Sequence, residues 1–571
     1  MNTIGTYEIR AMEIHDSTQI WNLERIERRL NFMVRNHMNA MVFHEPGIED
    51  KIVFPARFLG ADGHDNRYYD AFLKIDHQIY QHALRENLNL NRRDYMNHVI
   101  RLAREAGVDV YFENKELWFS DFVLKYKKEL MKDGVICPSD PFWYEEFLPA
   151  KYEELFVALP DLAGIVVSIG TGEARLAISN TFGCSCERCR KLSPVNWYRN
   201  MILAMYQPFK KAGKRLVIRD FIYTKAEQER FRQAFLEMPE DIELSLKNTP
   251  HDFYPTFPNN PLMGQVGSHP QWTEYDVQGQ FYGQGTIPSA MLDDIRRRLD
   301  YGRRHGVTAF MARTDWEGVQ DWSCFDNLNL LNLYAIASLS ENPAARNEEI
   351  YLKWLTGEGM LGSEATSAQI RGCLKWIDEV LGQTWNVVEH TNYINGCLFS
   401  NDSCMYLTTG QFTFIGGTHH SLKEWNPDAA DAMDMTPENI ARIVADKDDA
   451  LARATALNER LEERCPALTD AAWTKLKKHI RFMLLYVRAF RLNARGYCFG
   501  RYTELHGADA PLLNSTAGAL LKEVVADLKV YQSEMSDWTI LKEYPFEAQI
   551  SPERLEYFTR DLERILRGGQ A

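Results

Sequence analysis

The chain has 571 residues, of which 45% are hydrophobic, 25% charged and 12% aromatic. This composition is ordinary for a globular protein and excludes a disordered, collagen-like or coiled-coil chain, and the length predicts either several domains or one large barrel with an accessory domain. The 65 basic residues are outnumbered by 79 acidic ones, for a net charge of -14, so nucleic acid is not an expected partner. No apolar run approaches 20 residues, and we expect no membrane-spanning helix.

The first residues, MNTIGTYEIRAMEIHDS, contain neither the basic start nor the apolar core of a secretory signal. They predict a cytoplasmic protein, although a signal already removed would leave the same start. Most of the ten cysteines are scattered without the spacing of a disulfide framework, which indicates reduced thiols.

Eight β-branched or aromatic runs alternate with helical segments in the N-terminal part of the chain, the pattern of parallel βα units. The expected strands are 8–14, 39–43, 108–113, 164–169, 214–223, 242–247, 272–277 and 307–312. Helices are expected before Arg35 and at 91–105, 121–132, 195–212, 225–237 and 288–305. Eight such units predict a (β/α)8 TIM barrel over residues 1–335. A doubly wound sheet is the competing α/β fold, but no GxGxxG or GxxxxGK[ST] motif follows any expected strand.

The pattern then changes to helices alone, which predicts an α-helical C-terminal domain over 336–571. The expected helices are 347–355, 366–381, 436–464, 469–495, 515–535 and 551–567. Two of them begin with a hydroxyl residue, a proline and an acid, at Thr436 and Ser551, which is a typical helix start. Amphipathic stretches such as 475–492 indicate a packed core or a dimer interface and not membrane attachment.

In a barrel of this kind the active site lies at the C-terminal ends of the strands, where this sequence places many acids, bases and aromatic residues. Aromatic rings beside carboxylates are typical of a sugar pocket. Glycoside cleavage needs two carboxyl groups on either side of the scissile bond, and Glu173, Asp252 and Glu274 follow or end three different strands. The alternative is that such acids cap helices or pair with nearby Arg and Lys residues.

Two neighbouring segments, LKNTPHDFYPTFPNNPLMG (246–264) and TEYDVQGQFYGQG (273–285), resemble the paired signature of glycoside hydrolase family 67, the α-glucuronidases. The glutamate of IGTGEA (169–174) lies where that family has an acid after its fourth strand. The resemblance covers about residues 160–350. It implies that Glu173 is the general acid and Asp252 the general base, that Arg219 and Lys247 hold the uronate carboxylate, and that the protein is a dimer. Strand alternation independently points Arg219 and Lys247 inward, although salt bridges to Glu243, Asp220 or Asp252 inside the barrel would explain them as well.

The sequence also departs from the family. A second acid that assists the base falls at Gln280, and the family's N-terminal β-rich domain does not precede the first expected strand. Glu274, Asp16 or Glu113 could replace the missing acid, or the substrate could differ.

These observations predict a glycoside hydrolase that releases a terminal acidic sugar, α-linked glucuronic acid or a relative, with inversion. The expected catalytic residues are Glu173, Asp252 and Glu274. The expected substrate-binding residues are His15, Asp16, Glu113, Arg219, Lys247, Asn248, Trp272, Tyr275, Gln280, Arg313 and Trp316. No cofactor is implied, and the expected partners are a carboxylated carbohydrate and a second copy of the chain. The alternatives are a glycosidase or lyase for another carboxylated sugar, such as a sialic acid, and a non-catalytic sugar-binding barrel.

Three cysteines in NTFGCSCERCRKL (180–192), namely Cys184, Cys186 and Cys189, have the C-x-C-x2-C spacing of metal thiolates. Structural zinc needs four ligands, and no fourth lies nearby in the sequence, although Cys137, Cys324 or a histidine could reach the site through the fold. We therefore expect free thiols and no metal. His419 and His420 are expected to be packing or hydrogen-bonding residues.

Overall fold

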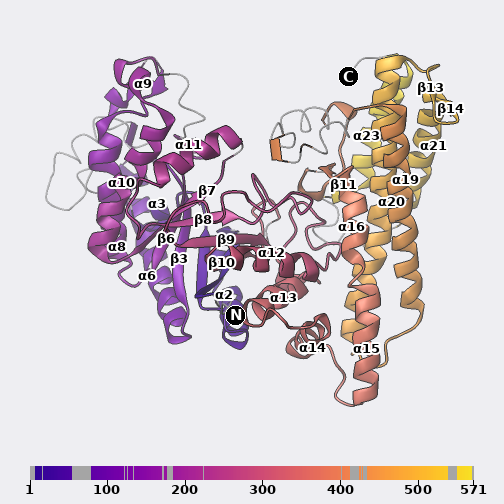
Figure 1. Cartoon of the computed structure of the whole chain (residues 1–571), viewed down its shortest axis with the longest axis horizontal. Helices are drawn as coiled ribbons and strands as arrows, with labels where there is room; N and C mark the ends of the chain where they lie inside the picture. The colour runs from indigo at the N-terminus through magenta and orange to yellow at the C-terminus, as the bar shows by residue number, and fades with distance from the viewer. Residues whose placement is uncertain are drawn as a thin grey trace. The chain divides into compact units, whose positions relative to one another are not determined.

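The computed structural model describes residues 7–568, without 16, 54–78, 121–122, 125–126, 133, 170–172, 177–183, 223, 320, 400, 412–423, 426, 428–433, 536 and 538–548. The chain packs as two compact units (Figure 1). The first comprises Met1–Asp252, Asn260–Tyr275 and Asp300–Arg313, and the second comprises Phe253–Asn259, Asp276–Leu299 and Thr314–Ala571.

The first unit contains a closed parallel barrel with the strand order β1-β10-β9-β8-β7-β6-β3-β2. Its strands are β1 (Ile9–Ile14), β2 (Ala40–His44), β3 (Asp109–Glu116), β6 (Gly164–Ile169), β7 (Arg215–Asp220), β8 (Glu243–Lys247), β9 (Gln271–Asp276) and β10 (Val307–Arg313). The expected (β/α)8 barrel is thereby confirmed, and each of the eight strands lies where the sequence pattern predicts it. The barrel closes where β1 pairs with β10, with Ile9 opposite Ala309 and Glu13 opposite Arg313.

Helices connect most of these strands along the chain, whereas the connection from β8 to β9, residues 248–270, contains none. The helices are α1 (Ser17–Ile20), α2 (Leu23–Arg35), α3 (Ile48–Ile52), α6 (Ile79–Glu105), α8 (Leu148–Ala158), α9 (Glu187–Lys191), α10 (Pro194–Ala212), α11 (Lys225–Phe235) and α12 (Leu292–Arg304). Gly107, Gly213 and Gly306 follow α6, α10 and α12 with φ of 74°, 66° and 77°, and this left-handed conformation ends a helix at no steric cost to glycine.

The connection after β3 differs from the prediction. Of the expected helix 121–132, residues 121–122 and 125–126 lie outside the described residues, and 123–124 are α-helical. The part that is described holds the short segment η1 (Lys128–Leu130) and the start of a small hairpin, β4 (Met131–Lys132) and β5 (Val135–Ile136). The covering helix comes later, as a π-helical turn (Phe142–Phe147) that continues into α8. Pro149 is compatible with this helix because it lies in the first turn of α8.

The inward-facing side chains of the barrel form two kinds of layer. At the N-terminal half of the strands they are apolar, a core of Ala11, Ala40, Val42, Tyr111, Val166, Val217, Trp272, Ala309 and Met311. Side chains two residues further along each strand point to the same side. There they are polar: Glu13, His44, Glu113, Ser168, Arg219, Ser245, Glu274 and Arg313, all buried. We call this second set the polar layer.

The second unit is mainly helical, as the sequence pattern predicts. It contains α13 (Leu330–Glu341), α14 (Asn347–Gly357), α15 (Ser367–Val380), α16 (Thr384–Asn392), α19 (Pro437–Glu459), α20 (Asp470–His506), α21 (Ala517–Met535) and α23 (Pro552–Leu566). The last four lie side by side in Figure 1, in orange to yellow. The sequence pattern did not predict α16 or two short hairpins, Tyr393–Leu398 and Pro511–Thr516. Among the described residues, no helix is both long enough and apolar enough to cross a membrane.

Candidate active site

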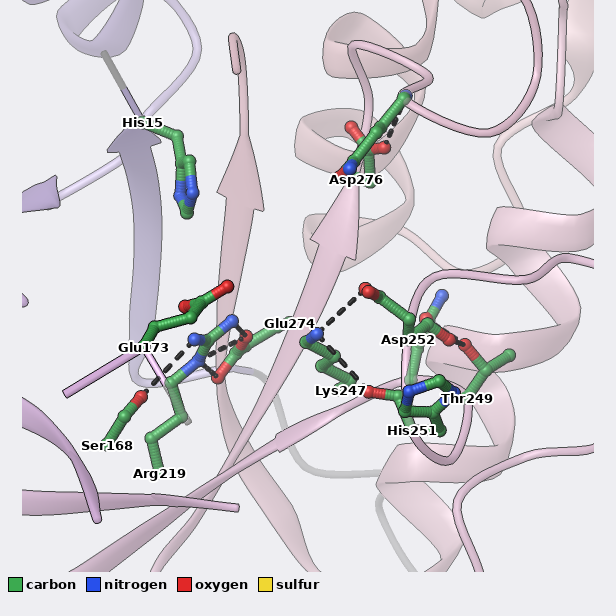
Figure 2. Close-up of polar contacts among 12 residues, drawn as sticks. His15, Ser168, Glu173, Arg219, Lys247, Thr249, His251, Asp252, Glu274 and Asp276 are labelled. Atoms are coloured by element: carbon green, nitrogen blue, oxygen red, sulfur yellow. Dashed lines mark hydrogen bonds and ion pairs between the residues drawn. The ribbon is translucent and has the colours of Figure 1, made fainter. Parts of the chain in front are cut away.

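The centre of the polar layer is an ion pair between Arg219 on β7 and Glu274 on β9 (Figure 2). Arg219 Nε donates to both carboxylate oxygens at 2.9 Å, and its Nη2 donates to Oε2 at 2.8 Å. Ser245 Oγ, on the strand between them, donates to Glu274 Oε1 at 2.6 Å. Arg219 Nη1 also lies 3.1 Å from Glu113 Oε1 and donates to Ser168 Oγ at 3.3 Å. The guanidinium is therefore surrounded by protein acceptors, but its carboxylate partners are Glu274 and Glu113 and not the Glu243, Asp220 or Asp252 of the ion-pair alternative.

A second group of titratable side chains comes from β1, β2 and β3. Glu13 and the Nδ1 atom of His15 form a hydrogen bond, and the rings of His15 and His44 stack with centroids 3.6 Å apart. His44 Nε2 lies 3.7 Å from Glu113 Oε1. The Arg219 side chain joins this group to Glu274 and Ser168, and through Glu274 to Ser245, so side chains of seven strands, β1–β3 and β6–β9, form one network.

Burial and neighbouring charges give the carboxyl groups of this network different protonation behaviour. Burial raises the pKa of Glu113 to about 8, and the nearby Glu13 and Glu274 add to this although Arg219 opposes it. Burial also raises the pKa of Glu13, but His15, Arg219 and Arg313 together outweigh it and bring the pKa below its ordinary value. Burial and the neighbouring cations hold the pKa of His44 well below its usual range. At neutral pH the network thus contains a protonated Glu113 beside an ionised Glu13.

Glu13, His15 and His44 also offer ligand atoms within 4.8 Å of one another, which is a spacing that a metal site could use. Arg219 and Arg313 act electrostatically on both Glu13 and His44. Fixed positive charge so close opposes a divalent cation, and we interpret these three residues as a group joined by the Glu13–His15 hydrogen bond and the His15–His44 ring stack.

Glu173 lies at the solvent side of the polar layer, in the connection after β6. Its side chain is 46% exposed and forms an ion pair with Lys115, a 5% exposed residue of β3. Since β3 and β6 are paired strands, this contact crosses two neighbouring strand ends. Glu173 thus combines access to solvent with a fixed, buried partner.

Asp252 lies in the connection after β8, which ends at Lys247. Lys247 Nζ donates to Asp252 Oδ1 at 2.7 Å and to the His251 carbonyl oxygen at 3.3 Å. Thr249 Oγ1 donates to the Asp252 carbonyl oxygen at 2.5 Å, and His251 turns the chain with a φ of 67°. These contacts form a tight turn that holds the carboxylate over the lysine, whose Nζ also lies 3.7 Å from the centroid of the Phe221 ring.

The electrostatic surroundings of Asp252 suit a base. Burial would raise its pKa, but Lys247 and His251 outweigh that effect and bring the pKa of Asp252 to about 2. The carboxylate is consequently ionised at neutral pH. Burial lowers the pKa of Lys247, which Asp252 partly offsets.

Asp220, the last residue of β7, points to the opposite side of the strand from Arg219. Gln228 Nε2 of α11 donates to Asp220 Oδ2 at 2.5 Å and to Asn260 Oδ1 at 3.4 Å. Asn260 Nδ2 in turn donates to the Lys247 carbonyl oxygen at 3.2 Å. Burial raises the pKa of Asp220 to about 7. This set supports the end of β8 from outside the barrel.

The structure places two expected pocket residues elsewhere. Trp272 is 0% exposed and belongs to the apolar core, where its Nε1 donates to Glu243 Oε2 at 2.6 Å at the start of β8. Tyr275 is buried on the outer face of β9, because it alternates with the inward-facing Glu274. Trp272 therefore faces inward one layer below Glu274, and Tyr275 faces outward, so neither belongs to the polar layer.

The remaining expected residues divide between the units. Asn248 follows Lys247, and its backbone N–H donates to the Glu274 carbonyl oxygen at 2.9 Å. Arg313 ends β10 in the polar layer. Gln280 and Trp316 belong to the second unit, where Gln280 Nε2 donates to Asp402 Oδ1 at 2.8 Å. Asp16, His419 and His420 lie outside the described residues.

Of the expected residues, the first unit brings together His15, Glu113, Glu173, Arg219, Lys247, Asp252, Glu274 and Arg313. The residues expected in the site did not include Glu13, His44, Lys115, Ser168 and Ser245. Strand alternation places such side chains inside the barrel, because Glu13 faces the same side as Ala11 and Ser245 the same side as Lys247.

No family model matches the chain, and no curated protein matches its sequence. Solved structures do match its fold. A GH138 enzyme that targets the pectin rhamnogalacturonan II superposes with a TM-score of 0.58 at 11% identity, over 98% of this chain and 68% of that one. A Thermobaculum terrenum O-GlcNAc hydrolase mutant gives a TM-score of 0.45 at 11% identity, over 98% of this chain and 95% of that one. A GH115 4-O-methyl-α-glucuronidase with specificity for decorated arabinogalactans also gives a TM-score of 0.45, at 12% identity, over 97% of this chain and 62% of that one.

The GH138 match shows a shared fold, a barrel followed by a helical region. Membership of family 67 remains a hypothesis.

Proposed function

We propose that this protein is a glycoside hydrolase that releases a terminal carboxylated sugar, α-linked glucuronic acid or a related uronic acid. The observation that carries the proposal is the Lys247–Asp252 pair. It presents an ionised carboxylate at the end of β8, while a second, solvent-accessible carboxyl group, Glu173, follows β6 two strands away. Strand β7 lies between them and supplies Arg219.

In this proposal Asp252 is the base that activates water, and Glu173 is the acid that protonates the leaving oxygen. The low pKa of Asp252 keeps the base ionised through the neutral range. The exposure of Glu173 lets its carboxyl group reach a bound glycoside. Inversion requires the two carboxyl groups to lie about 6.5–9.5 Å apart, with water on one face of the sugar and the leaving group on the other.

The proposed substrate class follows from the cations of the barrel mouth. Lys115, Arg219, Lys247 and Arg313 all face inward within a chain of net charge -14. Arg219 already has Glu274, Glu113 and Ser168 as partners, so we assign it the role of fixing Glu274 beneath the substrate. Lys247 lies closer to the strand ends, and it would bind the uronate carboxylate while it orients Asp252.

The test is a proton NMR time course with an aryl α-glucuronide and an aldouronic oligosaccharide. The expected first product is β-glucuronic acid, and both Glu173→Gln and Asp252→Asn should abolish its release. Glu240→Gln is the matched control, because Glu240 is an exposed acid before β8 outside the site.

An α-configured first product would overturn inversion. Turnover of a sialoside alone would favour a glycosidase for another carboxylated sugar over the uronidase. An unsaturated product that absorbs in the ultraviolet would favour a lyase. No turnover of any acidic glycoside would favour a sugar-binding barrel.

A further inference from the structure

Four cysteine side chains from two distant segments converge beside the barrel. Cys184, Cys186 and Cys189 lie between β6 and α10, and Cys137 directly follows β5 in the connection after β3. Their sulfur atoms all lie within 4.8 Å of one another. The sequence offered three of these ligands and could not identify the fourth, which is separated from Cys186 by about 50 residues.

The sulfur separations fit one tetrahedral metal ion. Cys137 Sγ lies 3.7 Å from both Cys186 Sγ and Cys189 Sγ. A disulfide would bring two sulfurs to about 2.05 Å. Four thiolates at about 2.3 Å from a central zinc ion lie about 3.8 Å from each other, close to the distances found here.

The backbone around the cluster is also arranged for bound thiolates. Cys186 occupies the N-cap position of α9, and its Sγ accepts a hydrogen bond from the Cys189 backbone N–H at 3.4 Å. Ser139 Oγ lies 3.0 Å from Cys189 Sγ. Such contacts to the sulfurs orient metal ligands and stabilise their charge.

Further contacts join the same two segments. Arg188 Nη2 donates to Asp140 Oδ2 at 2.6 Å, which links the residue between two of the cysteines to the Cys137 segment. The Trp143 indole N–H donates to the Cys137 carbonyl oxygen at 2.9 Å and fixes that segment from the other side. Arg188, Arg190 and Lys191 supply positive charge near a tetrathiolate site, which carries two net negative charges with a divalent ion.

We propose that Cys137, Cys184, Cys186 and Cys189 form a structural zinc site. Four cysteine ligands complete a tetrahedral zinc shell and leave no position for water or substrate, so the ion has a structural role. It cross-links the connection after β3 to the connection after β6. Those are the two connections whose strand ends hold the Lys115–Glu173 pair. The zinc proposal itself does not depend on the glycosidase proposal.

The test is metal analysis of the full chain purified from zinc-supplemented medium. The wild type is expected to carry one zinc ion per chain after dialysis against a weak chelator. Cys137→Ser and Cys189→Ser are expected to lower that ratio by at least about tenfold. Cys404→Ser is the matched control, a half-buried cysteine outside the cluster, and should retain the metal.

Cobalt(II) titration of the metal-free wild type gives a second measurement that does not depend on the variants folding. A tetrathiolate site should give intense sulfur-to-cobalt charge-transfer and tetrahedral ligand-field bands that saturate at one equivalent and disappear when zinc is added. Absence of these bands and of stoichiometric zinc would overturn the proposal, as would disulfides among these four cysteines in the freshly purified protein. Stoichiometric iron in place of zinc would overturn the choice of metal.

Discussion

Arg219 and Glu274 face each other across the intervening strand β8 and form three hydrogen bonds between buried charges, at 2.8–2.9 Å. Neither side chain is more than 2% exposed. Each of these two buried charges is therefore stabilised by the other, and loss of either residue would leave an unpaired charge in the polar layer.

Removing one charge from this pair is expected to be costly. Glu274→Gln should lower the free energy of unfolding by about 3–5 kcal/mol, because it leaves a buried guanidinium without its main counter-charge. Urea denaturation measures the change. Glu229→Gln is the matched control, since Glu229 pairs with Arg232 on the exposed face of α11 and should cost at most about 1 kcal/mol. Equal losses in the two variants would contradict the assigned role of Arg219–Glu274.

The Asp252 carboxylate should make stability depend on acid pH. Its pKa in the folded protein, about 2, lies below the ordinary value of 3.8, so it contributes stability that is present above about pH 4 and is lost as the pH falls through 2. The contribution is about 2 kcal/mol. The difference in unfolding free energy between wild type and Asp252→Asn should therefore be largest near neutral pH and shrink toward pH 2. A difference that does not change with pH would rule out this contribution.

Asp220 should have the opposite pH dependence. Its pKa in the folded protein, about 7, lies above the ordinary value, so the stability that it contributes is complete below about pH 4 and is lost as the pH rises through 7. The total change is about 4 kcal/mol. Asp220→Asn, which keeps an oxygen for Gln228, should become more stable relative to wild type between pH 5 and pH 8. Denaturant titrations at these two pH values measure it, and an unchanged difference would contradict the prediction.

Two tryptophans expected in the pocket should behave differently when truncated. Trp272→Ala should lower the free energy of unfolding by about 3–5 kcal/mol, because it empties part of the barrel core and leaves Glu243 without its indole donor. Trp316→Ala, at a half-buried position of the second unit, should cost clearly less. Calorimetry or urea denaturation compares them, and similar losses would contradict the core position of Trp272.

Removal of the proposed zinc ion should destabilise the barrel reversibly. A strong chelator is expected to lower the Tm of the wild type, and readdition of zinc should restore it, because the ion binds only the folded arrangement of its ligands. Cys137→Ser should begin at the lower Tm and respond to neither treatment. A wild-type Tm that is insensitive to chelation, in protein shown to have lost its zinc, would mean that the ion does not support the fold.

The sequence predicts the barrel well because each buried parallel strand is a continuous run of apolar or β-branched residues, as in Gly164–Ile169. It predicts Arg219 and Lys247 as inward-facing because alternation is local. It misplaces Trp272 and Tyr275, since proximity to Glu274 along the chain does not mean a shared height or face in the barrel. It leaves Cys137 undecided because that contact depends on tertiary structure. It misses Glu13 because alternation shows only that this acid faces inward, and the cations Arg219 and Arg313 that surround it come from distant strands.

The position of the barrel's closing seam has a consequence for biosynthesis. Glu13 and Arg313 are opposite one another in the β1–β10 pairing, although most of the first unit separates them in the chain. A ribosome must therefore synthesise β10 before the charged interior can be neutralised and sealed from water. Because pairing residues so far apart in the chain has a high entropic cost of loop closure, we expect the nascent barrel to complete its folding late. Until then, the charged side chains that the folded barrel buries stay exposed to water.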